Sequence, residues 1–304
     1  MMKTYILIGI AVVLVAGAAY GVYYLTQTQS GPETTQNQTG TPTPQPPAPS
    51  PAPTPQNEPE TVIGKSVQGS DITAYHYGEG EKELLFMGGI HGGYEWNTVL
   101  VAYELMDYLQ ANPNVIPQGV TVTVIPVLNP DGLQKVVGSA GRFAASSVPS
   151  SQEATIPGRF NANEVDLNRN FDCDWQSVGM WQSREVDGGT SAFSEPESRA
   201  FRDYVNAAKP AAVVVWYSAA GGVFASNCHN GVLPETNTIT NLFAQASGYP
   251  AYQEFNFYEI TGDAVNWLAK NNIPAISVLL SNHTNTEWSK NQAGITALLD
   301  YYAD

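Results

Sequence analysis

A histidine and a glutamate follow an apolar segment that ends in two glycines and an isoleucine, and these two side chains could hold a metal. His91 and Glu95 come directly after residues 83–90, which read ELLFMGGI. An imidazole nitrogen and a carboxylate oxygen are both ligands that Zn²⁺ accepts. The pair therefore indicates a metal site, with a solvated pair of surface side chains as the alternative.

A second group of polar side chains lies in a stretch without helical or strand periodicity. Residues 165–171 read VDLNRNF and, together with Arg159, supply two guanidiniums and two side-chain amides. A guanidinium binds a carboxylate through two parallel hydrogen bonds, and side-chain amides add further donors. The stretch predicts a carboxylate-binding loop, and an ion-paired structural loop is the alternative.

The composition limits the partners that such sites could serve. The chain has 304 residues, 43% of them hydrophobic, with 28 acidic residues against 13 Lys and Arg and a net charge of −15. No stretch is rich in Lys or Arg, which excludes nucleic acid as a partner and disfavours binding to an anionic membrane surface. Two cysteines are too few for a disulfide-rich miniprotein or a zinc ribbon.

The first 25 residues predict a membrane anchor. Residues 5–25 carry no charge, and tyrosines gather at their far end; such a length spans the ~30 Å hydrocarbon core of a bilayer. Lys3 precedes the segment and no cation follows before Lys65, which orients the rest of the chain outward. A cleaved signal peptide, with small residues at 16–18, is the alternative. Both interpretations place the remainder outside the cytoplasm.

Residues 26–60 are expected to form a disordered linker. They contain ten prolines, with Thr, Gln and Ser between them, and such a segment favours extended polyproline II over a packed core. Residues 61–304 then form a single domain that the linker holds away from the membrane, or that is secreted if the first segment is cleaved.

Within the domain, strand and helix signals alternate, which predicts an α/β sheet sandwiched by helices. A hairpin is expected in residues 62–77, a turn at residues 129–132, and a capping box at Ser194 with Glu197. Residues 134–189 lack periodicity and are expected to form functional loops. The other elements predicted are strands at 83–90, 120–127, 211–217 and 275–280, and helices at 98–109, 194–208, 263–270 and 288–302.

Six motifs together resemble the zinc carboxypeptidase family, metallopeptidases that remove a residue from the C-terminus of a peptide. In chain order the motifs are GGIHGGYEW (88–96), NPDG (129–132), GRFNANEVDLNRNF (158–171), FSEPE (193–197), YEITGDAVNW (258–267) and PAISVLLS (274–281). They follow the family's order and spacing over essentially the whole domain. The resemblance implies a mixed, mostly parallel eight-stranded sheet between helices, with the site at the strand ends.

The resemblance also implies roles for individual residues. It makes His91 and Glu95 the first two zinc ligands, and Arg159 the cation that polarises the scissile carbonyl. Asn168 and Arg169 would hold the terminal carboxylate of the substrate, and Tyr258 would be the mobile tyrosine that closes over it.

Two positions depart from the family's pattern, and both belong to the catalytic half of the site. Tyr217, before Ser218, stands where the family has its third zinc ligand, a histidine. Leu279 stands where the family has a glutamate as general base. A lesser departure is the four-residue step from His91 to Glu95, where the family usually has three; glycines at 92 and 93 could absorb it.

The two replacements predict that hydrolysis is weak or lost. A catalytic zinc has three protein ligands and one open position, so two ligands hold it poorly. Loss of a general base costs on the order of 10²- to 10⁴-fold in rate. Rescue is the alternative, and its candidates are Tyr217 as a phenolate, His229 or His283 as a third ligand, and Glu287 as a base.

The two cysteines are expected to pair outside the cytoplasm. A bridge from Cys173 to Cys228 would close a 55-residue loop and contribute about 4 kcal/mol in the chain-entropy model. Two separate buried thiols are the alternative.

The sequence therefore predicts an extracytoplasmic domain that recognises the free C-terminus of a peptide, of protein or cell-wall origin, with weak or absent hydrolysis. Zinc is implied by the resemblance, weakly held or absent. One alternative is an active zinc metallocarboxypeptidase with an altered metal site. A second alternative is a structural or adhesive surface domain.

Overall fold

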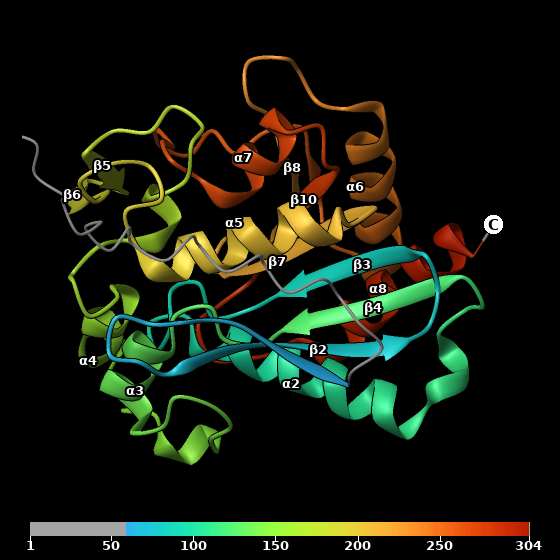
Figure 1. The fold of residues 1–304 in the computed structure, drawn as a ribbon, viewed down its shortest axis with the longest axis horizontal. Coiled ribbons are helices and arrows are strands. Elements are labelled where there is room, and N and C mark those ends of the chain that lie inside the picture. Colours follow the sequence, from blue (N-terminus) through green and yellow to red (C-terminus); the bar gives the residue numbers. More distant parts are fainter. Residues whose placement is uncertain (1–58, 304) are drawn as a thin grey trace, which may run out of the picture. The chain divides into compact units, whose positions relative to one another are not determined.

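Eight strands form one mixed sheet at the centre of the computed structural model, which describes residues 59–303 (Figure 1). The sheet order is β1-β2-β4-β3-β7-β10-β8-β9. The inner pairs β4–β3, β3–β7 and β7–β10 are parallel, as is β8–β9, and the other pairs are antiparallel. The strands are β1 (Glu60–Lys65), β2 (Asp71–Gly78), β3 (Lys82–Met87), β4 (Val120–Ile125), β7 (Ala212–Ser218), β8 (Gly222–Ala225), β9 (Ala251–Tyr252) and β10 (Ala275–Leu280).

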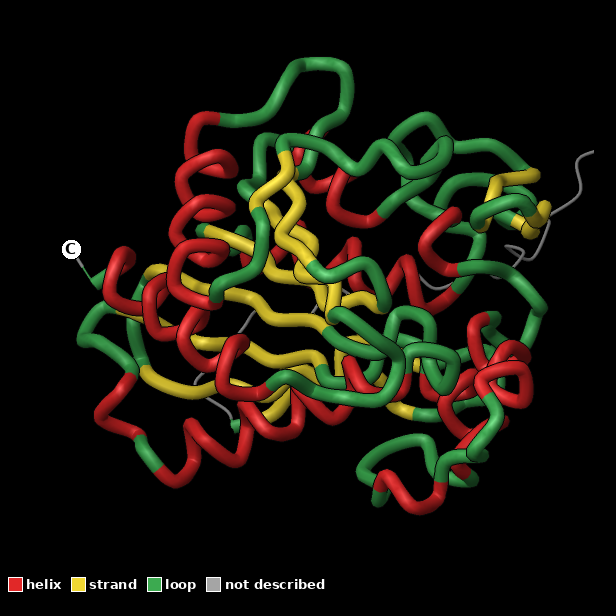
Figure 2. Tube along the Cα trace, turned by 180° about the vertical axis from the view of Figure 1, so that it is seen from behind, coloured by secondary structure: helices red, strands yellow, loops and turns green. Residues whose placement is uncertain are grey.

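Helices cover both faces of this sheet, so strands are enclosed between helices when the molecule is seen from behind (Figure 2). One hydrophobic core receives α2 (Trp96–Ala111), α6 (Pro234–Ser247) and α8 (Trp288–Tyr302). The other core receives α5 (Pro196–Ala208), which crosses the sheet in Figure 1, and α7 (Ala264–Lys270). The central strands are almost continuously apolar because both of their faces are buried. The predicted α/β sandwich is confirmed.

The chain between β4 and α5 is irregular, as predicted for residues 134–189. It also contains a two-stranded hairpin that the sequence did not indicate. The short elements of this region are α3 (Pro130–Val137), η2 (Ala145–Ser147), α4 (Gln152–Thr155), η3 (Ile156–Arg159), η4 (Leu167–Arg169), β5 (Val178–Trp181) and β6 (Arg184–Asp187), and one 3₁₀ turn, η1 (Pro113–Val115), precedes β4.

Two local predictions differ from the structure. The NPDG motif begins helix α3: the Gly132 N–H donates to the Asn129 side chain at 2.8 Å, and Pro130 takes the first helical position, where no N–H is needed. The predicted capping box is wrong. Glu195 is the N-cap of α5, and the Ser194 hydroxyl donates to the Glu195 carboxylate instead of capping the helix.

The strands β7 and β10 bring the two departures from the family's pattern together. They are parallel neighbours, with Tyr217 directly opposite Leu279 in the register. Both side chains lie on the face that packs towards α5 and α7. The positions of the family's third zinc ligand and general base are therefore adjacent, and the changes at them alter one continuous patch.

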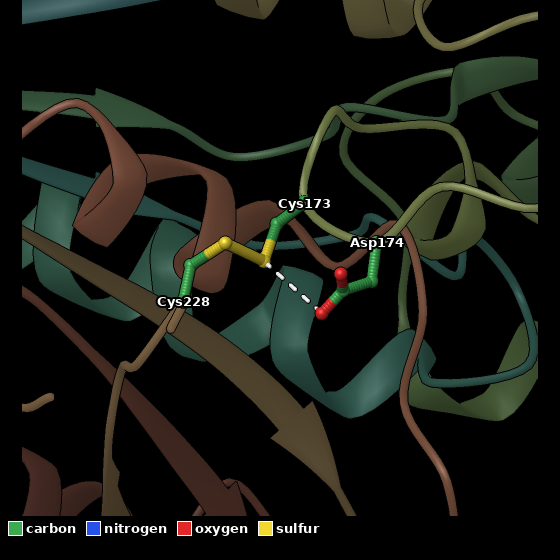
Figure 3. A group of neighbouring side chains, drawn as sticks. All are labelled: Cys173, Asp174 and Cys228. Carbon is green, nitrogen blue, oxygen red and sulfur yellow. Dashed lines mark hydrogen bonds between the residues drawn. A yellow bond between two sulfur atoms is a disulfide. The ribbon is translucent and has the colours of Figure 1, made fainter. Parts of the chain in front are cut away.

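The predicted disulfide is confirmed. Cys173 and Cys228 are joined, with their Cα atoms 6.2 Å apart, and the Asp174 carboxylate lies beside the bridge (Figure 3). The two sulfurs and this carboxylate are close enough together to suggest a metal site. Because the sulfurs are bonded to each other, they offer no thiolate, and the group is a crosslink rather than a metal centre.

The predicted anchor and nearly all of the predicted linker lie outside the described residues. Among the helices of residues 59–303, none combines the length and the apolar character that crossing a bilayer requires.

Candidate functional site

A cavity of about 480 Å³ lies at the carboxyl ends of β7 and β10. Its walls come from these strand ends, the loop before α2, the turn of the β5–β6 hairpin and the segment before α7. The cavity brings together seven of the eight residues assigned from the resemblance: His91, Glu95, Arg159, Asn168, Tyr217, Tyr258 and Leu279.

The predicted metal pair meets in this cavity. His91 Nδ1 lies 3.0 Å from Glu95 Oε1, although the two residues are four positions apart. Gly92 has a φ of +43°, and a Cβ there would lie 2.7 Å from the Gly158 carbonyl oxygen, so the loop needs glycine to make room for the additional residue. Both side chains are almost completely buried.

A third carboxylate, which the residue assignments did not include, stands behind this pair. Asp166 Oδ1 lies 3.3 Å from His91 Nε2, and Asp166 Oδ2 accepts from Nε of Arg159 at 2.8 Å. Burial would raise the pKa of Asp166, but the charge of the Arg159 guanidinium holds it well below its usual range. Asp166 therefore remains an anion that fixes the orientation of both neighbours.

Arg159 lines the cavity and packs against two aromatic rings. Its guanidinium carbon lies 4.5 Å from the centre of the Trp181 ring and 5.6 Å from that of Tyr94. Nη2 pairs with Asp166 at 2.8 Å and Nη1 approaches Glu95 Oε1 at 3.9 Å. This packing holds the guanidinium in one position on the cavity wall.

Asn168 is the centre of a hydrogen-bonded chain. Its amide nitrogen donates to Asp263 Oδ2 at 2.9 Å, and its oxygen accepts from the Tyr217 hydroxyl and the Ala264 N–H, both at 3.1 Å. Burial raises the pKa of Asp263, and hydrogen bonds from Asn266 N–H and Asn168 oppose the rise. These hydrogen bonds connect Tyr217, at the position of the family's third zinc ligand, to Asn168, which is predicted to bind the substrate carboxylate.

Of the remaining two predicted carboxylate-binding residues, Tyr258 lines the described cavity and Arg169 does not. Arg169 is 1% exposed and is not among the described residues that line the cavity; its guanidinium donates to the backbone carbonyls of Met180 and Asn168. Tyr258 does line the cavity, packed edge-on against Phe255. The guanidinium that reaches the cavity is that of Arg159.

The described cavity does not present the ligand set of a catalytic zinc. His91 Nδ1 and Glu95 Oε2 are buried without a hydrogen-bond partner, as expected of atoms that face a cation. Tyr217, however, donates its proton to Asn168, and burial raises the pKa of its hydroxyl well above the usual value, so a phenolate is disfavoured. Leu279 adds an apolar side chain that cannot accept a proton.

Of the histidines and the glutamate proposed as substitutes for the missing groups, only His283 is among the described residues that line the cavity. His229 pairs with Asp174 at 2.6 Å on an exposed loop outside the cavity. Glu287 accepts hydrogen bonds from Lys290, Ser281 and Tyr249; burial raises its pKa, but these bonds outweigh it and lower the pKa to about 2. His283 lines the cavity, with Nε2 3.5 Å from the Tyr94 hydroxyl.

Several residues that line the cavity, and one that stands behind its wall (Asp166), were not assigned from the sequence. Asp166 and Asp263 lie within the resemblance motifs but received no role, and Trp181 belongs to the hairpin that no periodicity indicated. Phe255 and Phe257 form an aromatic side of the cavity together with Phe224. The three aromatic residues at positions 255, 257 and 258 were the signal that could have suggested this wall.

An eight-stranded mixed sheet with a histidine–glutamate pair and an Asn-Arg loop at its strand ends is the arrangement of a metallocarboxypeptidase-type domain. The chain belongs to the zinc carboxypeptidase family, whose profile matches residues 55–296. Membership of this family implies zinc as the cofactor.

The curated relatives are distant and longer than this chain. Over 246 residues the chain is 26% identical to gamma-D-glutamyl-L-diamino acid endopeptidase 1 of Lysinibacillus sphaericus, covering 74% of this chain and 61% of that protein. Over 157 residues it is 29% identical to carboxypeptidase B of Helicoverpa zea, covering 49% of this chain and 35% of that protein. The chain therefore spans less than two thirds of either relative.

A solved structure supports the same fold. The crystal structure of thrombin activatable fibrinolysis inhibitor is similar with a TM-score of 0.64, covering 80% of this chain and 69% of that one, at 15% identity. At this identity the similarity concerns the fold alone.

Proposed function

We propose that this domain recognises the free C-terminal carboxylate of a peptide and hydrolyses it weakly or not at all. The observation that carries the proposal is the pairing of Tyr217 with Leu279 at the ends of adjacent strands. A hydrogen-bonded phenol and a leucine stand at the two positions that would complete the metal site and accept a proton from water. Binding residues are retained beside them.

The expected loss of rate is large. Without a third ligand, a zinc ion is held poorly and no bound water is acidified towards neutrality. Without a carboxylate base, a further factor on the order of 10² to 10⁴ is lost. Recognition of a carboxylate needs neither of these groups, because Arg159, Asn168 and Tyr258 line the cavity independently of a metal.

The partner is a peptide with a free C-terminus, of protein or cell-wall origin. A relative named for a γ-D-glutamyl-L-diamino acid bond supports the cell-wall alternative. The uncharged segment at residues 5–25 and the proline-rich residues 26–60 support a domain tethered outside the cytoplasm.

The test compares one peptide as its free acid and as its C-terminal amide, by calorimetry on the full chain. Loss of a charge-assisted contact costs about 1.5–3 kcal/mol, so the acid should bind roughly ten- to a hundred-fold more tightly. Tyr258→Phe should reduce this preference. Tyr108→Phe is the control: Tyr108 packs against Trp288, is not among the described residues that line the cavity, and its replacement should leave the preference unchanged. Equal affinity for acid and amide would refute carboxylate recognition.

A second candidate function is an active peptidase with an altered metal site. The retained geometry of His91, Glu95 and Asp166 favours it. Stoichiometric zinc in the purified chain, together with chelator-sensitive release of C-terminal residues, would decide for this alternative.

A further inference from the structure

Four side chains with metal-binding atoms meet at the disulfide, away from the strand-end cavity. The two sulfurs and one oxygen of Asp174 all lie within 4.8 Å of one another, as their side chains show in Figure 3. The imidazole of His229, the residue after Cys228, places Nε2 2.6 Å from Oδ1 of the same carboxylate. We call these four residues the bridge cluster: Cys173, Asp174, Cys228 and His229. None of them is among the described residues that line the cavity.

The atoms of the bridge cluster form a ligand set for zinc once the sulfurs are separated. Thiolate, imidazole and carboxylate are all zinc ligands, and a structural zinc site takes four of them in a tetrahedron. With zinc–sulfur distances of about 2.3 Å, two thiolates of such a site lie about 3.8 Å apart. The Cα atoms of the two cysteines are 6.2 Å apart, so rotation of their side chains can reach this spacing without a backbone shift.

Burial divides the bridge cluster into an inner and an outer half. Cys173 and Cys228 are 3% and 4% exposed, whereas the side chains of Asp174 and His229 are 48% and 70% exposed. Two buried sulfurs can hold an ion from the inside, and two exposed side chains can open and close over it. A metal site needs such an entry path, which the outer half provides.

Hydrogen bonds hold both loops of the bridge cluster independently of the disulfide. The carbonyl of Cys173 accepts from the Gly262 N–H at 2.7 Å. On the other side, the N–H of Asn227, next to Cys228, donates to the Asn266 side chain at 3.0 Å. Opening the disulfide therefore leaves both sulfurs on loops that remain anchored to the segment before α7 and to α7 itself.

We propose that the bridge cluster binds one zinc ion when its disulfide is reduced, so that the metal takes over the crosslink between the loops after η4 and β8. While the disulfide is closed, its sulfurs offer no thiolate. A dithiol reductant supplies two electrons and two protons: the Cys173–Cys228 bond breaks, two thiols form, and the dithiol becomes a disulfide. Zinc then displaces both thiol protons, and the Asp174 carboxylate and His229 imidazole complete its four ligands.

The experiment titrates cobalt(II) into the oxidised and the reduced full chain. The reduced chain is prepared with a dithiol, which is then removed under exclusion of oxygen. Cobalt should give a sulfur-to-metal charge-transfer band at one equivalent in the reduced chain and no such band in the oxidised chain, and zinc should abolish the band because it binds these ligands more tightly. The chain has two cysteines, so a metal at His91 and Glu95 cannot produce this band. A reduced chain without the band would overturn the proposal.

Thermal unfolding separates a folded site from two thiols on an unfolded chain. Zinc that binds the folded state raises its melting temperature, whereas equal binding to the unfolded state does not. Zinc should therefore raise the melting temperature of the reduced chain, and by more than that of the oxidised chain. An equal shift in both forms, or none in the reduced form, would contradict the proposed site. This comparison uses the unmodified chain, so it does not depend on whether a variant folds.

Matched variants identify the two outer ligands. Asp174→Asn and His229→Gln should each lower the cobalt affinity read from the charge-transfer band by at least about ten-fold, since each removes a metal contact. Asp172→Asn is the control, because Asp172 is an exposed carboxylate two positions away that pairs with Lys270. It should leave the affinity unchanged. An unchanged affinity in either Asp174→Asn or His229→Gln would overturn the four-residue site.

Discussion

Tyr217 and Leu279 occupy the two positions at which the expected metal ligand and general base are replaced, and both line the cavity. The two residues are direct neighbours in the sheet, Tyr217 on β7 and Leu279 on β10. The position expected to bind the metal and the position expected to accept a proton therefore lie side by side in the cavity wall. The hydroxyl of Tyr217 is committed to Asn168. The wall of the cavity therefore carries a hydrogen-bonded phenol and an apolar side chain at these two positions, on which the proposed loss of catalysis rests.

Reversal of both replacements is the direct test at this scale. Tyr217→His should raise zinc affinity, because the site regains three ligands, but should give little turnover without a base. Leu279→Glu alone should give less still, since it adds a base without an acidified water. The double variant should exceed the product of the single effects, because metal and base act on one water. Zinc content and release of C-terminal amino acids are the measurements, and unmodified protein as active as the double variant would contradict the expectation.

The sequence predicted the parts of the site that depend on residue type, and missed those that depend on packing. The pairing of His91 with Glu95 was predicted from motif spacing and is found despite the additional residue between them. The withdrawal of Arg169 from the cavity could not be predicted, because it results from carbonyl groups of Met180 and Asn168 that only the folded chain brings near. The assigned roles of these residues remain predictions.

At the scale of elements, the segment between β10 and α8 places His283 in the wall of the cavity. Glu287, in the same segment, fixes the conformation of this segment through its hydrogen bonds. The Glu287 carboxylate accepts from the Ser281 N–H and the Tyr249 hydroxyl, each at 2.7 Å, and from Lys290 at 2.8 Å. A carboxylate bonded to several donors stabilises the folded state only while it is ionised.

Glu287 should therefore make the stability of the domain depend on pH. Burial raises its pKa, but hydrogen bonds from Lys290 and Ser281 lower it from 4.5 to about 2. The stabilisation is complete above the unfolded value and is lost as the pH falls from 4.5 towards 2. Glu287→Gln should lower the free energy of unfolding at pH 7, and the difference should shrink below pH 4.5. Denaturant unfolding at several pH values measures it, with the exposed Glu81→Gln as control; a constant difference would contradict the prediction.

Elements with strong periodicity were predicted well, and short ones were missed. The strand at 275–280 and the helix at 288–302 match β10 and α8, since burial on both faces or on one stripe leaves a clear pattern. The strands β8 and β9 are four and two residues long, too short to show a period. Helix α6 begins with polar residues, and its first turn carries no side-chain cap. Pro234 at the first helical position and Glu235 in the first turn were nevertheless signals that could have indicated its start.

At the scale of the whole molecule, the disulfide joins the loop after η4 to the loop after β8. The sequence separation of 55 residues makes it a long-range constraint. In the chain-entropy model, closing a loop of this length stabilises the folded state by about 4 kcal/mol. Replacement of both cysteines, Cys173→Ser with Cys228→Ser, should lower the melting temperature, and a reducing agent should have the same effect on the unmodified chain. A melting temperature unaffected by reductant would show that the bridge does not form.

The predicted order of anchor, linker and domain has its own test. Protease added outside intact cells should cut within residues 26–60 and release a soluble fragment of about 26 kDa, because extended proline-rich segments are accessible to proteases. Immunoblotting of the supernatant against the cell fraction is the measurement. A fragment that is soluble before protease treatment would indicate cleavage of a signal peptide, and protection of the domain would contradict the predicted orientation.

Trp181 lines the cavity, so its fluorescence can be used to follow binding there. Its indole packs against both the Arg159 guanidinium and the Tyr94 ring, and among the described residues that line the cavity it is the one tryptophan. The emission of an indole depends on the polarity and the charges around it. Any occupant that displaces water from this wall or contacts the Arg159 guanidinium will alter the fluorescence of the unlabelled protein, which offers an optical titration of binding that does not require turnover.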